Sequence, residues 1–75
     1  MGEIVNKTSL KIAMLKFNDT QETLAKAMGI SLSRLNAKIN CNGAEFTQNE
    51  IIFIKQRYGL TAADVDNIFF DTKVS

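Results

Sequence analysis

The sequence contains no histidine and no proline, and it has one cysteine and four glycines in 75 residues. Without histidine, the chain cannot use an imidazole as a general acid, a general base or a metal ligand. Cys41 therefore has no histidine to activate it as a nucleophile. The glycines are isolated from one another, which excludes a glycine-rich phosphate-binding loop. Asp64 and Asp66 would point in different directions from a helix, so they are poor partners for catalysis by paired carboxylates. We expect a protein that is not an enzyme and needs no cofactor or metal.

The sequence also lacks a long apolar run and a second cysteine. No stretch is long enough to span a membrane, and the N-terminal MGEIVNK has no apolar core of the kind that a signal peptide requires. A single cysteine allows no internal disulfide, which is typical of a protein in a reducing cytoplasm. We therefore expect a cytoplasmic protein that does not enter a membrane, with Cys41 half-buried in a loop.

The chain does contain enough apolar material for one small helical domain. Apolar residues make up 45% of the sequence and include five phenylalanines. The absence of proline and the few glycines favour helices joined by short turns. Apolar residues recur at helical spacing in five segments, which predicts a compact all-α domain of five helices over residues 1–75. The expected elements are a flexible arm over residues 1–7 and helices from Thr8 or Ser9 to about Phe17, from Gln21 to Met28, from Leu32 to about Asn40, from Gln48 to Tyr58, and from Thr61 onward.

Short polar residues mark the beginnings of four of these helices. A hydroxyl oxygen just before a helix can accept a hydrogen bond from an N–H group of the first turn. Two of the four starts also have an acidic residue three positions later, which is the spacing of a capping box. The predicted caps are Thr20, Ser31, Thr47 with Glu50, and Thr61 with Asp64.

The first helix is predicted to be apolar on more than one side. An apolar pattern of this width is typical of a helix that packs against several others. The residues expected to face the core are Leu10, Ala13, Met14 and Phe17, with Ile12 and Leu15 widening the apolar surface.

Residues 21–40 have the pattern of two short helices joined by a tight turn. Ala25 is small where the two helices would cross closely, and Gly29 stands where the first would end in a left-handed conformation, which costs glycine least. Leu35 and Ile39 then give the second helix one apolar face. This spacing is typical of a helix-turn-helix.

The same segment resembles the helix-turn-helix of the phage repressor and Cro group, the lambda-repressor-like family. The strings KIN, EFTQNEI and IFF also resemble parts of small regulators encoded by temperate phages of Gram-positive bacteria. The resemblance implies a lambda-repressor-like domain that places the second helix of the motif in the DNA major groove. In that family the glutamine that opens the motif contacts a phosphate, as expected of Gln21, and Asn40 matches a position that often does the same. Lys38 departs from the family pattern, which usually keeps an apolar residue nearby, and Ile39 is expected to be buried in its place.

The outer face of the motif's second helix carries most of the residues expected to touch DNA. Arg34 and Lys38 have the spacing of side chains on one side of a helix, and we expect them to contact phosphates. Ser33 and Ala37 are small enough to let the helix approach base edges. Each has an ordinary alternative, because solvated charges and small residues are common on helix surfaces. The predicted DNA-binding residues are Gln21, Ser31, Leu32, Ser33, Arg34, Asn36, Ala37, Lys38 and Asn40.

The distribution of charge is more favourable to DNA binding than its sum. The net charge of +1 is low for a nucleic-acid binder and counts against that function. However, the segment between Glu22 and Glu45 contains three basic residues and no acidic one, whereas three aspartates and a single lysine follow Leu60. The basic part of the chain therefore coincides with the helix expected to enter the groove.

Two functions of different classes are consistent with these patterns. The first is a sequence-specific, Cro-like transcriptional regulator of a phage genetic switch, with double-stranded operator DNA as its partner and a homodimer forming through the domain itself or only on DNA. The alternative is a modulator that binds the phage repressor protein. Phe53 and Phe70 are the candidate residues for a protein interface, although for Phe53 packing beneath the fifth helix is an equally good interpretation. DNA binding should weaken steeply with salt, whereas a largely apolar protein interface should not.

Overall fold

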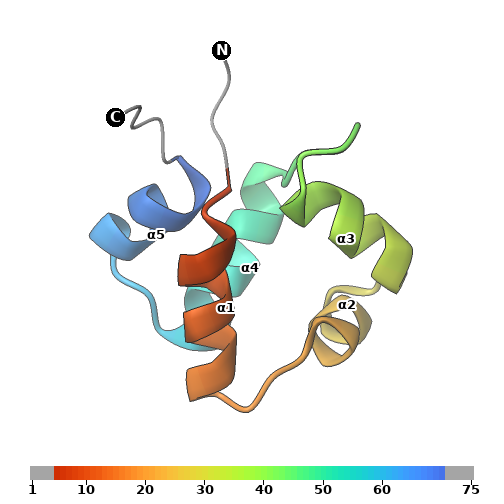
Figure 1. Ribbon diagram of the computed structural model, residues 1–75. Helices are drawn as coiled ribbons and strands as arrows, with labels where there is room; N and C mark the ends of the chain where they lie inside the picture. Colours follow the sequence, from red (N-terminus) through yellow and green to blue (C-terminus); the bar gives the residue numbers. More distant parts are fainter. Residues whose placement is uncertain (1–4, 71–75) are drawn as a thin grey trace.

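The computed structural model describes residues 5–70, and this part of the chain forms five α-helices and no β-strand (Figure 1). The predicted all-α class with five helices is therefore confirmed. No helix within the described range is long and apolar enough to cross a membrane. The helices are α1 (Lys7–Lys16), α2 (Gln21–Met28), α3 (Leu32–Ile39), α4 (Gln48–Tyr58) and α5 (Ala62–Phe69).

Local hydrogen bonds at the helix starts explain why the boundaries of α2 to α5 follow the sequence closely. Thr20, Ser31, Thr47 and Thr61 all accept a hydrogen bond from the backbone N–H three residues later. The two predicted capping boxes are present. A third joins Thr20 to Thr23, whose hydroxyl accepts a hydrogen bond from the Thr20 N–H at 2.8 Å. It was missed because the pattern calls for a longer polar side chain at the third position.

The start of α1 differs from the expectation. Asn6 caps this helix in place of Thr8 or Ser9, because its side-chain oxygen accepts a hydrogen bond from the Ser9 N–H at 3.0 Å. The Asn6 N–H in turn donates to the Ile68 carbonyl at 2.7 Å, and Val5 is buried. The prediction of a flexible arm is thus wrong for residues 5–7, which belong to the domain, while residues 1–4 lie outside the described part.

The core is shared by all five helices. α2 packs chiefly against α3, while α5 packs against α1 and α4. In Figure 1, α2 and α3 form one side of the domain, α5 forms the opposite side, and α1 and α4 lie between them. Phe69 of α5 faces inward and meets Phe46 edge to face, with ring centroids 5.2 Å apart. The largest fully buried side chains come from the first four helices and are Leu10, Leu24, Leu35 and Ile54.

Two large apolar side chains of α1, and Phe17 just after it, are exposed within the described part of the chain. Ile12, Leu15 and Phe17 are 49%, 67% and 54% exposed. The expectation that Phe17 faces the core is wrong, because α1 ends at Lys16 and Phe17 lies on the Tyr58 ring at a centroid distance of 5.4 Å.

A cluster around Asp19 ties the α1–α2 connection to the end of α4. The Asp19 carboxylate accepts hydrogen bonds from the hydroxyls of Thr23 and Tyr58 and from two nitrogens of Arg57, at 2.8 and 3.1 Å. The side chain of Asp19 is 7% exposed. The hydrogen bond from Arg57 holds the pKa of Asp19 well below its usual range, and those from Thr23 and Tyr58 add to it, so that together they outweigh the effect of burial. Burial and the Asp19 carboxylate raise the pKa of Tyr58.

The connection between α3 and α4 is a polar turn. Cys41 has a φ of +54° and is exposed, so the prediction that it is half-buried is wrong. The Asn42 N–H donates to the Ala37 carbonyl at 2.8 Å, which folds the turn back on the end of α3.

Candidate nucleic-acid interface

The α2–α3 pair is held by a three-residue turn. α2 ends at Gly29, which has a φ of +75° in the left-handed region that favours glycine. The N–H groups of Gly29 and Ile30 donate back to carbonyls of α2 at 3.1 and 3.0 Å. Ser31 then starts α3 by accepting a hydrogen bond from the Arg34 N–H at 3.1 Å. Ala25 is 2% exposed in the packed core, as its small size predicted.

The outer face of α3 is exposed and, apart from Leu32, consists of small or polar side chains. Leu35 and Ile39 turn inward and are buried, which leaves the opposite side of the helix accessible. α3 contains no acidic residue. Among the predicted contact residues, those exposed are Ser31, Leu32, Ser33, Arg34, Asn36 and Asn40, while Gln21 and Ala37 are half-buried.

Lys38 is not on this face, and its predicted exposure beside Arg34 is wrong. Its side chain is 3% exposed, and its Nζ donates to Glu50 Oε1 at 2.9 Å and to the Glu45 carbonyl at 3.0 Å. Glu50 Oε1 also accepts the N–H of Thr47 at 2.9 Å. Burial alone would raise the pKa of Glu50, but the hydrogen bonds from Thr47 and Lys38 lower it overall. Lys38 and Ile39 are therefore both buried, and Lys38 joins α3 to the start of α4.

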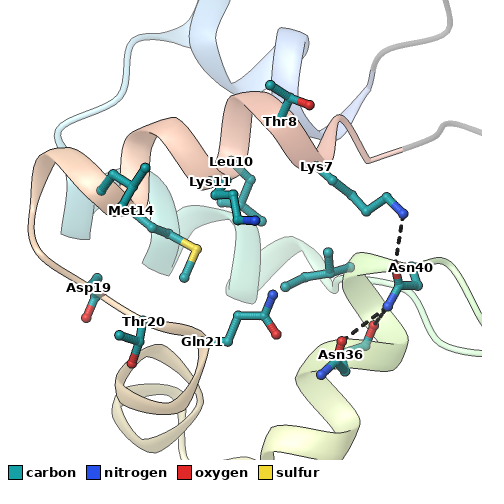
Figure 2. Close-up of a pocket in the computed structure, with 12 residues that line it drawn as sticks. Lys7, Thr8, Leu10, Lys11, Met14, Asp19, Thr20, Gln21, Asn36 and Asn40 are labelled. Carbon is teal, nitrogen blue, oxygen red and sulfur yellow. Dashed lines mark hydrogen bonds between the residues drawn. The ribbon is translucent and has the colours of Figure 1, made fainter.

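A groove lies beside the outer face of α3, between α1 and the start of α2 (Figure 2). Its volume is about 540 Å³. The Gln21 side chain extends from the start of α2 toward the space between α1 and α3. Sequence reasoning missed the α1 side of this groove, because Lys7 and Lys11 lie far from the α2–α3 segment along the chain. The residues around the groove are Lys7, Thr8, Leu10, Lys11, Met14, Leu15, Asp19, Thr20, Gln21, Asn36, Ile39 and Asn40.

A chain of hydrogen bonds crosses one end of the groove. Lys7 Nζ donates to Asn40 Oδ1 at 3.1 Å, and Asn40 Nδ2 donates to the carbonyl and to Oδ1 of Asn36 at 2.9 and 3.2 Å (Figure 2). The amide of Asn40 therefore has both ends engaged within the protein. This arrangement fixes the orientation of Asn36 on the outer face of α3.

The two candidate residues for a protein interface lie in different environments. Phe70 is 42% exposed just after α5. Phe53 is half-buried and packs against the core. Its side chain is therefore less accessible to a protein partner than that of Phe70.

Among residues 5–70, no group of acidic and cysteine side chains is placed to hold a metal ion. Comparison of the chain with protein-family models, curated proteins and solved structures gave no match.

Proposed function

We propose that the protein is a sequence-specific DNA-binding transcriptional regulator, Cro-like, of a phage genetic switch. In this proposal α2 and α3 form the helix-turn-helix of a lambda-repressor-like domain, and α3 enters the major groove of double-stranded DNA. The observation that carries the proposal is the outer face of α3, which is exposed, free of acids and, apart from Leu32, built from small or polar side chains.

The residues of that face divide into two roles. Ser33 and Asn36 can exchange hydrogen bonds with base edges, and the half-buried Ala37 offers a methyl group to a thymine methyl. Arg34 is exposed at the edge of the face, where a guanidinium can contact a phosphate. Gln21, at the first position of α2, is the corresponding phosphate contact on the other helix of the motif.

One α3 reads only a few base pairs, so two copies on a near-palindromic operator are the expected functional unit. Their two recognition helices would then lie one helical turn apart along the DNA. The low net charge of +1 makes non-specific DNA binding weak, so the proposed affinity has to come from contacts at a matched site.

The first test is selection of binding sites from a random duplex library, followed by fluorescence anisotropy on the selected duplex and on a scrambled one. We expect the selected duplex to bind roughly 1,000-fold more tightly or better. Arg34→Ala should weaken binding to both duplexes and lower the salt slope by about 0.9. Lys55→Ala removes an exposed charge from α4 and serves as the control. A selection that enriches no sequence from the library would contradict sequence-specific DNA binding by this protein.

A second candidate function, binding to the phage repressor protein, is favoured by the exposed apolar side chains in and just after α1. Three large ones, Ile12, Leu15 and Phe17, are about half or more exposed within six residues of the chain, and such surfaces commonly mark protein contacts. Binding of this kind should vary little with salt and should be lost in an Ile12→Ser variant that still folds, since Ile12 lies outside the groove beside α3. The same variant should bind DNA normally if regulation acts through DNA alone.

A further inference from the structure

We propose that the groove between α1, the start of α2 and α3 seats the sugar–phosphate backbone of one DNA strand, with Lys7 and Lys11 as phosphate ligands. The inference rests on the DNA-binding function proposed above and adds a second contact surface to it. It also assigns Asn40 a positioning role, in place of the phosphate contact that the sequence resemblance implies.

The chemistry around the groove matches a nucleic-acid backbone. Lys7 and Lys11 supply ammonium groups from α1, while Thr20 and Gln21 supply a hydroxyl and an amide from the start of α2. All four can donate hydrogen bonds to phosphate oxygens. The single acid at the groove, Asp19, is already paired with Arg57, so it adds little repulsion toward a phosphate.

The floor of the groove argues against a small apolar ligand. Leu10, Met14 and Ile39 line it, but they are only 1%, 5% and 5% exposed, whereas Leu15 beside them is 67% exposed. Pockets for drug-sized ligands normally bury most of the ligand against apolar walls, and Leu15 is the one widely exposed large apolar side chain around this groove. A shallow apolar floor with a donor-rich rim instead suits a backbone, in which deoxyribose alternates with phosphate.

The groove is connected to the base-reading face through Asn40. Asn36 Oδ1 accepts a hydrogen bond from Asn40, so the Asn36 amino group is directed away from that contact and keeps its N–H donors for a base edge. Asn40 is itself held by Lys7. An ammonium group has three N–H donors, so Lys7 can hold Asn40 and a phosphate oxygen at the same time. A phosphate in the groove would therefore stabilise the orientation in which Asn36 meets a base.

The test measures DNA affinity against salt concentration for single and double alanine variants at Lys7 and Lys11, using the selected duplex. Lys16→Ala is the matched control, because Lys16 is an exposed lysine of the same helix that lies outside this groove. Each phosphate contact contributes about 0.9 to the slope of log affinity against log salt, so the double variant should lose about 1.8. Lys16→Ala should keep the wild-type slope.

Asn40→Ala separates positioning from phosphate binding. We expect it to keep the wild-type salt slope but to change the preference at the base pair that Asn36 faces. Lys7→Ala should change both the slope and that preference, and Lys7→Arg should restore the slope. Circular dichroism melts of every variant check that the fold is intact.

Two outcomes would overturn the inference. If Lys7→Ala with Lys11→Ala leaves the slope unchanged while Arg34→Ala lowers it, the backbone does not occupy the groove, although the DNA-binding function stands. If the wild-type protein shows no DNA binding in the library selection, the inference fails together with the proposed function.

Discussion

Replacing Asp19 with asparagine would remove the charge from the cluster that joins the α1–α2 connection to α4, while keeping the shape of the side chain. The carboxylate accepts hydrogen bonds from three residues and is 7% exposed, whereas the side chain of its partner Arg57 is 33% exposed. Removing one partner of a buried ion pair costs about 3–5 kcal/mol. Because Arg57 can regain water, we expect a smaller loss in the free energy of unfolding, roughly 2–4 kcal/mol.

The loss should be visible in both denaturant and thermal unfolding. For a domain of this size about 1 kcal/mol lowers Tm by 4–8 °C, so Asp19→Asn should lower Tm on the order of 10–30 °C. Urea unfolding followed by circular dichroism at neutral pH gives the free energy itself. Asp66→Asn removes an exposed aspartate of α5 and is the control. A loss below about 1 kcal/mol for Asp19→Asn would refute the argument that this cluster holds the connection to α4.

The pH dependence of stability gives an independent check on Asp19. Its pKa is lower in the folded state than in the unfolded chain, so its contribution is complete above the unfolded value of about 4 and is lost as the pH falls below it. Glu50 and Asp64 also have lowered pKa values and contribute in the same direction. The wild-type protein should therefore lose stability below about pH 4 more steeply than Asp19→Asn. Equal slopes for the two proteins would contradict a charged, hydrogen-bonded Asp19.

Three further predictions concern α2 and α3. Glu50→Ala should lower the free energy of unfolding by roughly 3 kcal/mol or more, because it leaves the buried ammonium of Lys38 without its carboxylate partner. Lys38→Met should lower it by about 1 kcal/mol and leave the salt slope of DNA binding unchanged. Urea unfolding measures the two stability losses, and a salt titration of DNA binding measures the slope. Ala25→Leu should destabilise the domain by roughly 1–3 kcal/mol through overpacking, and a native Tm with native DNA binding would contradict the close crossing of α2 and α3. Ser33→Ala or Ala37→Gln should change base preference by about 1–3 kcal/mol with little effect on Tm, and equal shifts on all operator variants would exclude them from base reading.

Features that depend on a few neighbouring residues could be predicted from the sequence. The starts of α2 to α5 follow from hydroxyl groups that accept a hydrogen bond from the backbone N–H three residues later. The end of α2 follows from Gly29 in a left-handed conformation. α1 is the exception, because Asn6 caps it in place of the predicted Thr8 or Ser9. Asn6 is favoured over Thr8 by a contact that no local pattern contains, the hydrogen bond from its N–H to Ile68.

Features that join distant parts of the chain could not be predicted in the same way. Asp19 and Arg57 are separated by 38 positions, and Lys7 and Asn40 by 33. Helical periodicity assigns each side chain to a face, but it does not say which other helix that face meets. The exposed outer face of α3 could therefore be predicted from its own pattern, whereas the groove beside it depends on where α1 packs.

Arg34 and Lys38 lie in different environments because α4 packs beside one of them and not the other. Both are basic residues of α3, but Lys38 lies nearer the core face, where a cation needs a carboxylate partner. Glu50 meets that need because its capping role already holds it at the start of α4. One positive charge is thereby removed from the outer surface of α3 on the α4 side. Lys7 and Lys11 of α1 line the groove beside α3, so under the proposed function we expect a bound DNA strand to pass along the α1 side of the domain.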